Sequence, residues 1–329
     1  MSYAQYIRDI AKGQNSTKDL TTEDACFLYG AILDGGVPDF ELGAIITALR
    51  LKGETVDEMR GFYEAANNRT HFVSLPQSRY RPLVLPTYNG ARRGANLTPL
   101  LALLLQKFGV PVLVHGLLEG YGRVSTANVF RELGVMPIIH LSQIPSAMNN
   151  VGLVFVPLPV IAKGLADQLA LRARTGLRNC AHSLVKMLDP FRGEGVVVMA
   201  ATHPPYQAMM REVALSSGQP ALLLRATEGE PFANPKRRPD IEFLDNGAQE
   251  ILFEAEHDSL KGLPGLPDEP DAKTTAVWTR KVLDGVVTIP HPLAHQLAAC
   301  LYAVGYAQTL SEAKAIVAVE GFASGVSHE

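Results

Sequence analysis

Short apolar runs alternate with helix-like patterns over most of this chain. The runs predict six strands, at Leu83–Leu85, Val112–His115, Pro137–His140, Val151–Val156, Val196–Ala201 and Ala221–Leu224. Between them, apolar residues recur with the period of a helix at Pro99–Phe108, Ser125–Leu133, Ile161–Gly176, Ala181–Met187 and Pro205–Ser217. Because alternating strands and helices build parallel sheets with helices on their faces, we predict an α/β fold with a mostly parallel sheet flanked by helices.

Helix signals alone fill the segment before the first strand. A first helix is expected after a cap at Thr21 or Thr22 and before the glycine pair at 35–36, and a second ends at Gly53. Thr55 and Glu58 have the spacing of a capping box for a third helix. We therefore expect a small helical unit at the N-terminus.

The last third of the chain has weaker patterns. Residues 226–272 are rich in Gly, Pro and charge, and we expect an irregular excursion with one short strand at Ile241–Leu244. Helices are predicted at Lys273–Asp284 and Pro292–Val304, and a third is expected to start at a Ser311 cap.

Composition narrows the class of protein. With 329 residues, 47% of them apolar, the chain can bury a substantial core. Its net charge of −3 gives no overall attraction to nucleic acid, so the distribution of charge matters more than the sum. No apolar run reaches the roughly 20 residues that span a bilayer, and the first residues lack the apolar core of a signal peptide. The three distant cysteines argue against a disulfide framework or a zinc site, so a cytoplasmic protein without membrane contact is expected.

The loop at 86–96 has the form of an anion site. It follows the strand Leu83–Leu85 and leads into a strongly apolar helix, so its backbone N–H groups are expected to point at an anion. The loop holds no acidic residue and carries Arg92 and Arg93. Phosphate contact and a solvated turn explain these two arginines equally well.

Two further groups of cations stand out. Arg174 and Arg178 are four residues apart on one predicted helical segment, which places them on the same face; ion pairing of this helix with Asp167 is the alternative. The basic trio at 236–238 lies between two prolines and is expected on an exposed loop. An electrostatic patch and plain solubility are both open for this trio.

Histidines offer weaker candidates. His115 ends a predicted strand, where a structural role is commoner than a catalytic one. His291 and His295 are four apart at a helix start, but no third ligand stands at metal spacing, so we predict no metal site.

Longer stretches resemble a known family. The segments LTTEDA, ILDGGVPDFELGAIITALRLKGET and RTGLR through LDPF stand in the order found in anthranilate phosphoribosyltransferase and the wider glycosyltransferase family 3, whose fold is shared with pyrimidine nucleoside phosphorylases. The resemblance implies the phosphoribosyltransferase class IV fold, with an N-terminal helical domain at 1–78 joined by helices from 160–190, and an α/β domain at 79–329. It also implies a homodimer.

The family's phosphate-binding residues are largely replaced here. Its Gly-Thr-Gly-Gly-Asp-Gly loop falls on residues 86–91, and its magnesium-holding Asp-Glu pair falls near Pro231 and Phe232, with Glu228 and Glu230 out of register. Magnesium on a phosphate normally needs such carboxylates, so no cofactor, metal site or catalytic residue is expected. The resemblance leaves a vestigial phosphate and substrate site at Thr87, Gly90, Asn96, Thr98, His115, Gly116 and Arg172.

The segments TEGEPFANPKRR and WTRKVLDG resemble the bacterial YbiB-type paralogues of this enzyme. This resemblance implies a catalytically degenerate homodimer that binds DNA and RNA through the phosphate backbone without sequence specificity, in the DNA-damage response. We expect the contacts to come from Arg92, Arg93, Arg123, Arg172, Arg174, Arg178, Lys186, Lys236, Arg237 and Arg238.

Two alternatives stay open at this point. One is an active transferase of the tryptophan-biosynthesis type, which would use magnesium and transfer the phosphoribosyl group of phosphoribosyl pyrophosphate to anthranilate or another aromatic acid, with pyrophosphate as the leaving group. The other is a protein that binds a phosphorylated metabolite without turnover.

Overall fold

The computed structural model describes residues 2–12, 17–258, 263 and 265–320. The N-terminal helices are α1 (Tyr3–Ile10), α2 (Thr22–Leu33), α3 (Asp39–Lys52) and α4 (Val56–Asn68). The strands are β1 (Leu83–Thr87), β2 (Val112–Gly116), β3 (Leu153–Pro157), β4 (Val196–Ala201), β5 (Ala221–Arg225), β6 (Ile241–Asp245) and β7 (Ala248–Phe253). The remaining helices are α5 (Thr98–Lys107), α6 (Thr126–Leu133), the 3-10 turn η1 (Leu141–Gln143), α7 (Ile144–Val151), α8 (Leu158–Ile161), α9 (Lys163–Ala170), α10 (Arg172–Thr175), α11 (Ala181–Leu184), α12 (Pro204–Ser217), α13 (Ala272–Leu283), α14 (His291–Ala303) and α15 (Leu310–Val319).

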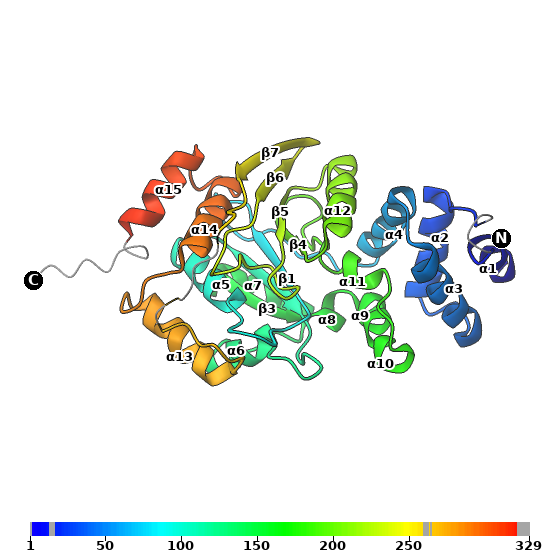
Figure 1. Ribbon diagram of the computed structural model, residues 1–329, viewed down its shortest axis with the longest axis horizontal. Helices are drawn as coiled ribbons and strands as arrows, with labels where there is room; N and C mark the ends of the chain where they lie inside the picture. The colour runs from blue at the N-terminus through cyan, green and yellow to red at the C-terminus, as the bar shows by residue number, and fades with distance from the viewer. Residues whose placement is uncertain (1, 13–16, 259–262, 264, 321–329) are drawn as a thin grey trace, which may run out of the picture.

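The N-terminal helices form a small helical domain at one end of the molecule. Figure 1 shows them beside α9–α11, whereas α13–α15 lie at the opposite end. The predicted capping box is present, since the Thr55 hydroxyl accepts the Glu58 N–H and the Glu58 carboxylate accepts the Thr55 N–H. The helix α1 was not predicted. Its signal was the spacing of Tyr6 and Ile10, which are four apart and both buried.

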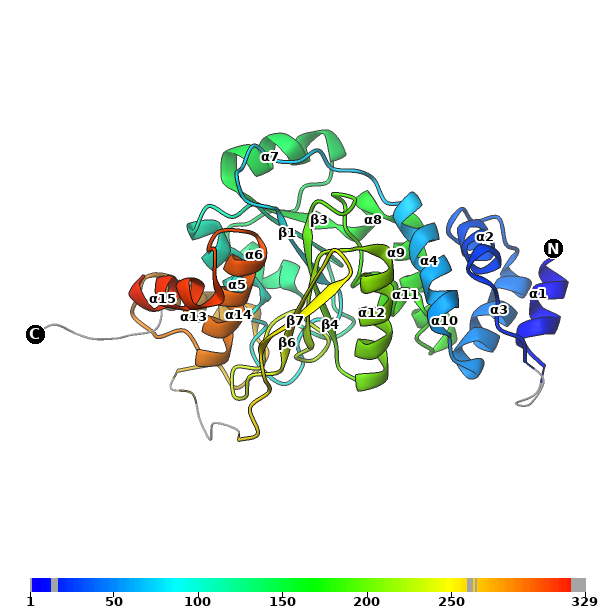
Figure 2. The ribbon, with the colours of Figure 1, turned by 90° about the horizontal axis from the view of Figure 1, so that it is seen from above.

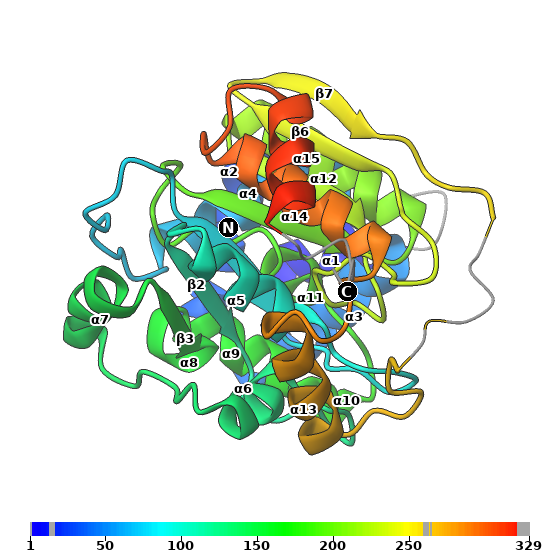
Figure 3. The ribbon, with the colours of Figure 1, turned by 90° about the vertical axis from the view of Figure 1, so that its left-hand side faces the viewer.

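The larger domain is built on a mostly parallel sheet of seven strands in the order β3-β2-β1-β4-β5-β6-β7. The first five are parallel, and β6 and β7 are antiparallel additions at one edge. Figure 3 shows β6 and β7 at one side of the sheet and α7 with β3 at the other. The predicted α/β fold, a mostly parallel sheet flanked by helices, is therefore confirmed.

Each face of the sheet has its own apolar core. Val84 and Leu113 belong to a core that continues through α12 into the N-terminal helices, whereas Leu83 and Leu85 belong to a core with α5, α13 and α14. Successive residues of a strand point to opposite faces of the sheet. Because helices cover both faces, nearly every residue of a central strand must be apolar. Figure 2 shows α12 beside α4, so the first core joins the two domains.

The strand order reverses between β1 and β4. From β1 the chain proceeds to β2 and β3 on one side, and from β4 it proceeds to β5 on the other. In open sheets of this kind, a crevice forms outside the carboxyl ends of the two central strands. Thr87 and Ala201 end these strands, so the loops that follow them meet at this crevice.

One strand prediction was wrong, and another named a real strand, β3, but placed its start two residues too early. At Pro137–His140 only a single bridge forms, between Pro137 and Phe155, because this segment lies outside the β3 edge and Ile139 is largely exposed. The strand predicted from Val151 begins at Leu153, since Val151 is the last residue of α7.

The segment 226–272 is less irregular than expected. It contains a hairpin of β6 and β7, and the turn is Asn246–Gly247, both with positive φ. An Asn-Gly pair between two apolar segments is the strongest short-range hairpin signal, so the sequence did contain the information.

In place of the single helix expected at Ile161–Gly176 there are two short helices, α9 and α10, and Ile161 itself is the last residue of α8. Ala162 leaves the helical conformation, and Gly176 ends α10 in the left-handed region. Arg178 therefore lies beyond the helix and does not share a helical face with Arg174. Among the described residues, no helix combines the length and apolar character needed to cross a bilayer.

Candidate functional site

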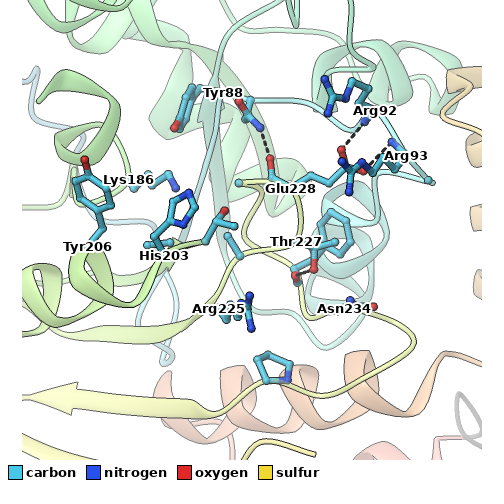
Figure 4. A pocket seen from close by; sticks show the side chains of 18 of the residues that line it. Tyr88, Arg92, Arg93, Lys186, His203, Tyr206, Arg225, Thr227, Glu228 and Asn234 are labelled. Carbon is cyan, nitrogen blue, oxygen red and sulfur yellow. Dashed lines mark hydrogen bonds between the residues drawn. The ribbon is translucent and has the colours of Figure 1, made fainter. Parts of the chain in front are cut away.

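A cleft of about 1090 Å³ lies at the crevice between β1 and β4. Its lining comes from the loops after β1, β4 and β5, from Arg50 on α3, and from the segment 178–186. In Figure 4, Arg92 and Arg93 lie on one side of the cleft, and Lys186, His203 and Tyr206 lie on the other. Residues far apart in the chain thus line one continuous hollow.

The lining of this cleft is strongly basic. Ten of its side chains are Lys or Arg: Arg50, Arg92, Arg93, Arg123, Arg178, Lys186, Arg225, Lys236, Arg237 and Arg238. Five are acidic: Glu54, Glu228, Asp240, Glu256 and Asp268. The whole chain has a net charge of −3, so positive charge is concentrated here.

Most of these cations are not neutralised within the chain. Eight make no ion pair with a described carboxylate: Arg50, Arg92, Arg93, Arg123, Arg178, Lys186, Arg225 and Arg237. Burial lowers the pKa of Arg123, and repulsion from Arg92 and Arg178 lowers it further. A group of like charges held together in this way attracts an anion.

The predicted anion loop is occupied by the protein's own carboxylates. Glu230, which is fully buried, accepts the backbone N–H groups of Asn89 (2.7 Å) and Gly90 (2.8 Å) on one oxygen, Oε1. Its other oxygen accepts the hydroxyls of Thr87 and Thr126. The N–H groups that a phosphate would use at Asn89 and Gly90 are therefore satisfied internally.

A second carboxylate lies one turn away. Glu228 accepts the N–H of Arg92 (2.9 Å) on Oε2 and the N–H of Arg93 (2.8 Å) on Oε1. Its own backbone has φ +55°, and Gly229 follows with φ +95°. Together they form a two-residue hairpin turn, in which Thr227 and Glu230 exchange backbone hydrogen bonds. This turn aims both carboxylates at the loop after β1.

The residues predicted as a vestigial phosphate site do gather at this loop. Thr87, Asn96, Thr98 and His115 are buried. The Asn96 amide donates to the hydroxyl of Thr126, and burial lowers the pKa of His115 to about 4. Position 116 requires glycine for a steric reason, because a Cβ there would overlap the carbonyl oxygen of Thr87 on the neighbouring strand. The side chains of Thr87, Asn96, Thr98 and His115 are buried and are not among the residues that line the cleft.

Glu228 and Glu230 are the carboxylates at this loop to which a magnesium ion on a phosphate would have to bind. Such an ion needs carboxylate oxygens that are open to it. All four oxygens of Glu228 and Glu230 already accept hydrogen bonds from backbone N–H groups or threonine hydroxyls.

Three of the predicted cations, Arg172, Arg174 and Lys186, do not present a free charge to the cleft. Arg174 is exposed and pairs with Asp39 at 3.2 Å, outside the cleft. Arg172 lines a smaller hollow with Tyr88 and Tyr121.

Lys186 lines the cleft but is buried, and its ammonium donates to the carbonyl of Ala200 at 2.6 Å. Burial lowers the pKa of Lys186 to about 8. Its charge is therefore held inside the protein rather than offered to a ligand.

The sequence did not single out two cations that line the cleft, Arg50 and Arg225. Arg225 ends β5, and the carboxyl end of a parallel strand next to the switch point was a usable signal. Arg50 comes from α3 and donates to the Tyr206 hydroxyl at 2.7 Å. Its position depends on how the two domains pack.

The fold also brings a third possible metal ligand, Glu256, close to His291 and His295. The ligand atoms of Glu256, His291 and His295 lie within 4.8 Å of one another. Arg238, however, donates to His295 Nδ1 at 2.7 Å and pairs with Glu256 at 3.2 Å. The arrangement is an ion-paired network centred on Arg238.

Comparisons with known proteins agree with this fold. Residues 4–69 match the helical bundle domain of a glycosyl transferase family. The chain is 42% identical over 318 residues to the uncharacterized protein YbiB of Escherichia coli, covering 96% of this chain and 99% of that one. It is 25% identical over 321 residues to an anthranilate phosphoribosyltransferase of Prochlorococcus marinus, covering 95% and 91%. The crystal structure of anthranilate phosphoribosyltransferase from Thermus thermophilus has a similar fold, with a TM-score of 0.77 at 22% identity over 98% of this chain and 94% of that one.

Proposed function

Because this chain belongs to the anthranilate phosphoribosyltransferase-like family that includes YbiB, we propose that it keeps the family's fold but binds nucleic acid in place of phosphoribosyl pyrophosphate. In this proposal a cytoplasmic homodimer holds DNA or RNA by the phosphate backbone, without sequence specificity and without catalysis. In this proposal the protein acts in the DNA-damage response.

The observation that carries the proposal is the concentration of unpaired cations along one cleft. Ten basic side chains face five acidic ones, and eight of the ten form no ion pair with a described carboxylate. Small-molecule pockets are mostly apolar and place only a few polar groups. A row of cations suits a chain of phosphates, and such contacts position a polynucleotide without reading its bases.

The absence of catalysis in this proposal is supported by the occupied loop. Transfer of a phosphoribosyl group depends on holding and neutralising the leaving pyrophosphate. At Asn89 and Gly90 the buried Glu230 takes the N–H groups, and a buried anion repels a second anion from the same place.

A homodimer in this proposal is supported by exposed apolar side chains on the helical domain. Phe27 on α2, and Phe40 and Leu51 on α3, are 64%, 85% and 80% exposed. Large apolar side chains in such number on one small unit favour a protein contact. Light scattering after size exclusion tests this; a monomer at micromolar concentration would contradict it.

The main experiment measures binding of two duplexes and two single strands of unrelated sequence by fluorescence anisotropy at several salt concentrations. We expect similar affinities for unrelated sequences, and a log–log salt slope that grows by about 0.9 for each phosphate neutralised. The absence of binding to every probe at low salt would refute the proposal.

Matched variants locate the contact. Arg225→Ala and Arg237→Ala each remove an unpaired cation from the cleft. Each variant should weaken the binding of all nucleic-acid sequences to the same extent and lower the log–log salt slope of binding by about 1. Arg174→Ala removes the same charge outside the cleft and serves as the control. Equal losses in all three variants would place the contact elsewhere.

The fold favours one other candidate, transfer of a phosphoribosyl group to anthranilate or another aromatic acid with magnesium as cofactor. It predicts that phosphoribosyl pyrophosphate with magnesium raises the melting temperature, because a ligand that binds only the folded state stabilises it. We expect no shift at millimolar ligand. A shift of several degrees, lost without magnesium, would favour the transferase.

A further inference from the structure

The two carboxylates that occupy the loop after β1 differ in their access to solvent. Glu230 is fully buried and holds the N–H groups of Asn89 and Gly90. Glu228 is partly exposed and lines the cleft, where it holds the N–H groups of Arg92 and Arg93. The second pair of donors belongs to exposed residues that line the cleft, whereas Asn89 and Gly90 are buried.

The Arg92–Arg93 pair of N–H groups has the geometry of an oxyanion site. Each donates to a different oxygen of Glu228, at 2.9 and 2.8 Å. A phosphodiester also has two non-bridging oxygens with a negative charge, and backbone N–H groups beside Arg side chains are common phosphate donors. The guanidinium of Arg123 lines the same cleft and is attracted by Glu228, and its only hydrogen bond among the described residues is a long one (3.5 Å) to the Gly90 carbonyl.

We propose that Glu228 is an exchangeable occupant of a phosphate site, and that a backbone phosphate of a bound polynucleotide replaces its carboxylate at the N–H groups of Arg92 and Arg93. This inference rests on the proposed function and names the place where the polynucleotide is held most closely. Glu230 stays in position, because its exit would leave buried N–H groups without an acceptor.

Replacing the Glu228 carboxylate by a phosphate at these N–H groups requires little free energy. Its carboxylate already reaches solvent, so leaving the N–H groups returns it to water rather than to an apolar interior. An incoming phosphate repels the carboxylate and meets Arg92, Arg93 and Arg123, whose side chains form no ion pair with a described carboxylate. The electrostatic attraction between Arg123 and Glu228 then acts on the phosphate instead. Glu228 therefore competes with the polynucleotide for the N–H groups of Arg92 and Arg93. This competition lowers the affinity of the protein for the polynucleotide.

The first test follows backbone amide signals by nuclear magnetic resonance while a single-stranded thymidine oligonucleotide is added to the full chain. We expect the amides of Arg92 and Arg93 to shift and those of Asn89 and Gly90 to stay. Binding of the oligonucleotide without movement of the Arg92 and Arg93 amides overturns this inference and leaves the proposed function standing. Failure to bind the oligonucleotide at all refutes the proposed function.

Inorganic phosphate distinguishes the source of the phosphate group. We expect the oligonucleotide to shift the Arg92 and Arg93 amides at far lower phosphate concentration than the free ion, since neighbouring cations act together only on a polymer. Equal effects at equal phosphate concentration would overturn the assignment to a polynucleotide.

The second test is the substitution Glu228→Gln, which removes the competing charge and keeps the size. We expect oligonucleotide affinity to rise about tenfold, as expected when one charge-assisted pair of hydrogen bonds no longer has to be broken. Asp240→Asn removes the same charge from another part of the cleft and should raise affinity much less. If both variants gain the same oligonucleotide affinity, Glu228 acts only through its charge in the cleft and not at the N–H groups, and the inference is overturned.

Discussion

The buried carboxylate of Glu230 leads to a stability prediction that can be worked out from its contacts. In Glu230→Ala the N–H groups of Asn89 and Gly90 lose their acceptor at a position where the wild-type side chain is 0% exposed. Each buried donor left without a partner costs about 1–3 kcal/mol. The variant also removes a buried charge, which offsets part of this cost. We expect the free energy of unfolding to fall by about 2–5 kcal/mol.

The substitution Glu230→Gln should be much milder. Both N–H groups end on the same oxygen, Oε1, so an amide oxygen in that position can accept both. The amide nitrogen then faces the hydroxyls of Thr87 and Thr126, which can accept as well as donate. Replacing charge-assisted by neutral hydrogen bonds should cost about 1–2 kcal/mol.

The assay is equilibrium urea unfolding followed by circular dichroism. Glu228→Ala is the matched control, because it removes the same kind of contact from the same turn where solvent can replace it, and it should cost less than about 1 kcal/mol. If Glu230→Ala is no more destabilising than Glu228→Ala, the reasoning that Glu230 satisfies the loop is wrong.

Further predictions concern packing and pH. Gly116→Ala places a Cβ onto the Thr87 carbonyl and should destabilise by more than about 2 kcal/mol, whereas Gly43→Ala, with open space in α3, should stabilise by about 0.5–1 kcal/mol; urea midpoints of both variants check this. Burial lowers the pKa of His115 to about 4, so the unfolded chain binds its proton more tightly; stability should therefore fall as the pH drops from about 6.5 to 4. His115→Gln should flatten that part of the profile, and an unchanged slope would contradict the assignment. Burial lowers the pKa of Lys186 to about 8, so stability should rise between pH 8 and about 10.5 in the wild type; Lys186→Met should abolish that rise in urea unfolding at high pH.

Local patterns in the chain were sufficient for most of the fold. The capping box at Thr55 and the run Val196–Ala201 depend on neighbours a few residues away, and both were predicted correctly. The hairpin at Asn246–Gly247 was missed although its signal is equally local. The run at Pro137–His140 looked like a strand but lies beyond the edge strand, a position that only the assembled sheet defines.

The candidate site was predicted less completely, for a physical reason. Arg92 and Arg93 could be recognised from the loop that carries them, and the trio at 236–238 from its charge. The placement of Glu228 and Glu230 against that loop joins residues more than 130 positions apart. Nothing in their spacing predicts this contact, because it requires β5 to lie beside β4 and the turn after β5 to reach back across the crevice.

The sequence by itself therefore determined the helices, the parallel sheet and the presence of an anion-binding loop, since these follow from periodicity and turn chemistry within short segments. Only the tertiary structure decided what the loop holds. Folding brings two carboxylates onto its N–H groups and leaves the guanidinium groups around it without an ion pair to a carboxylate among the described residues. That division arises because hydrogen bonds and charge act across space, whereas the sequence orders residues along a line.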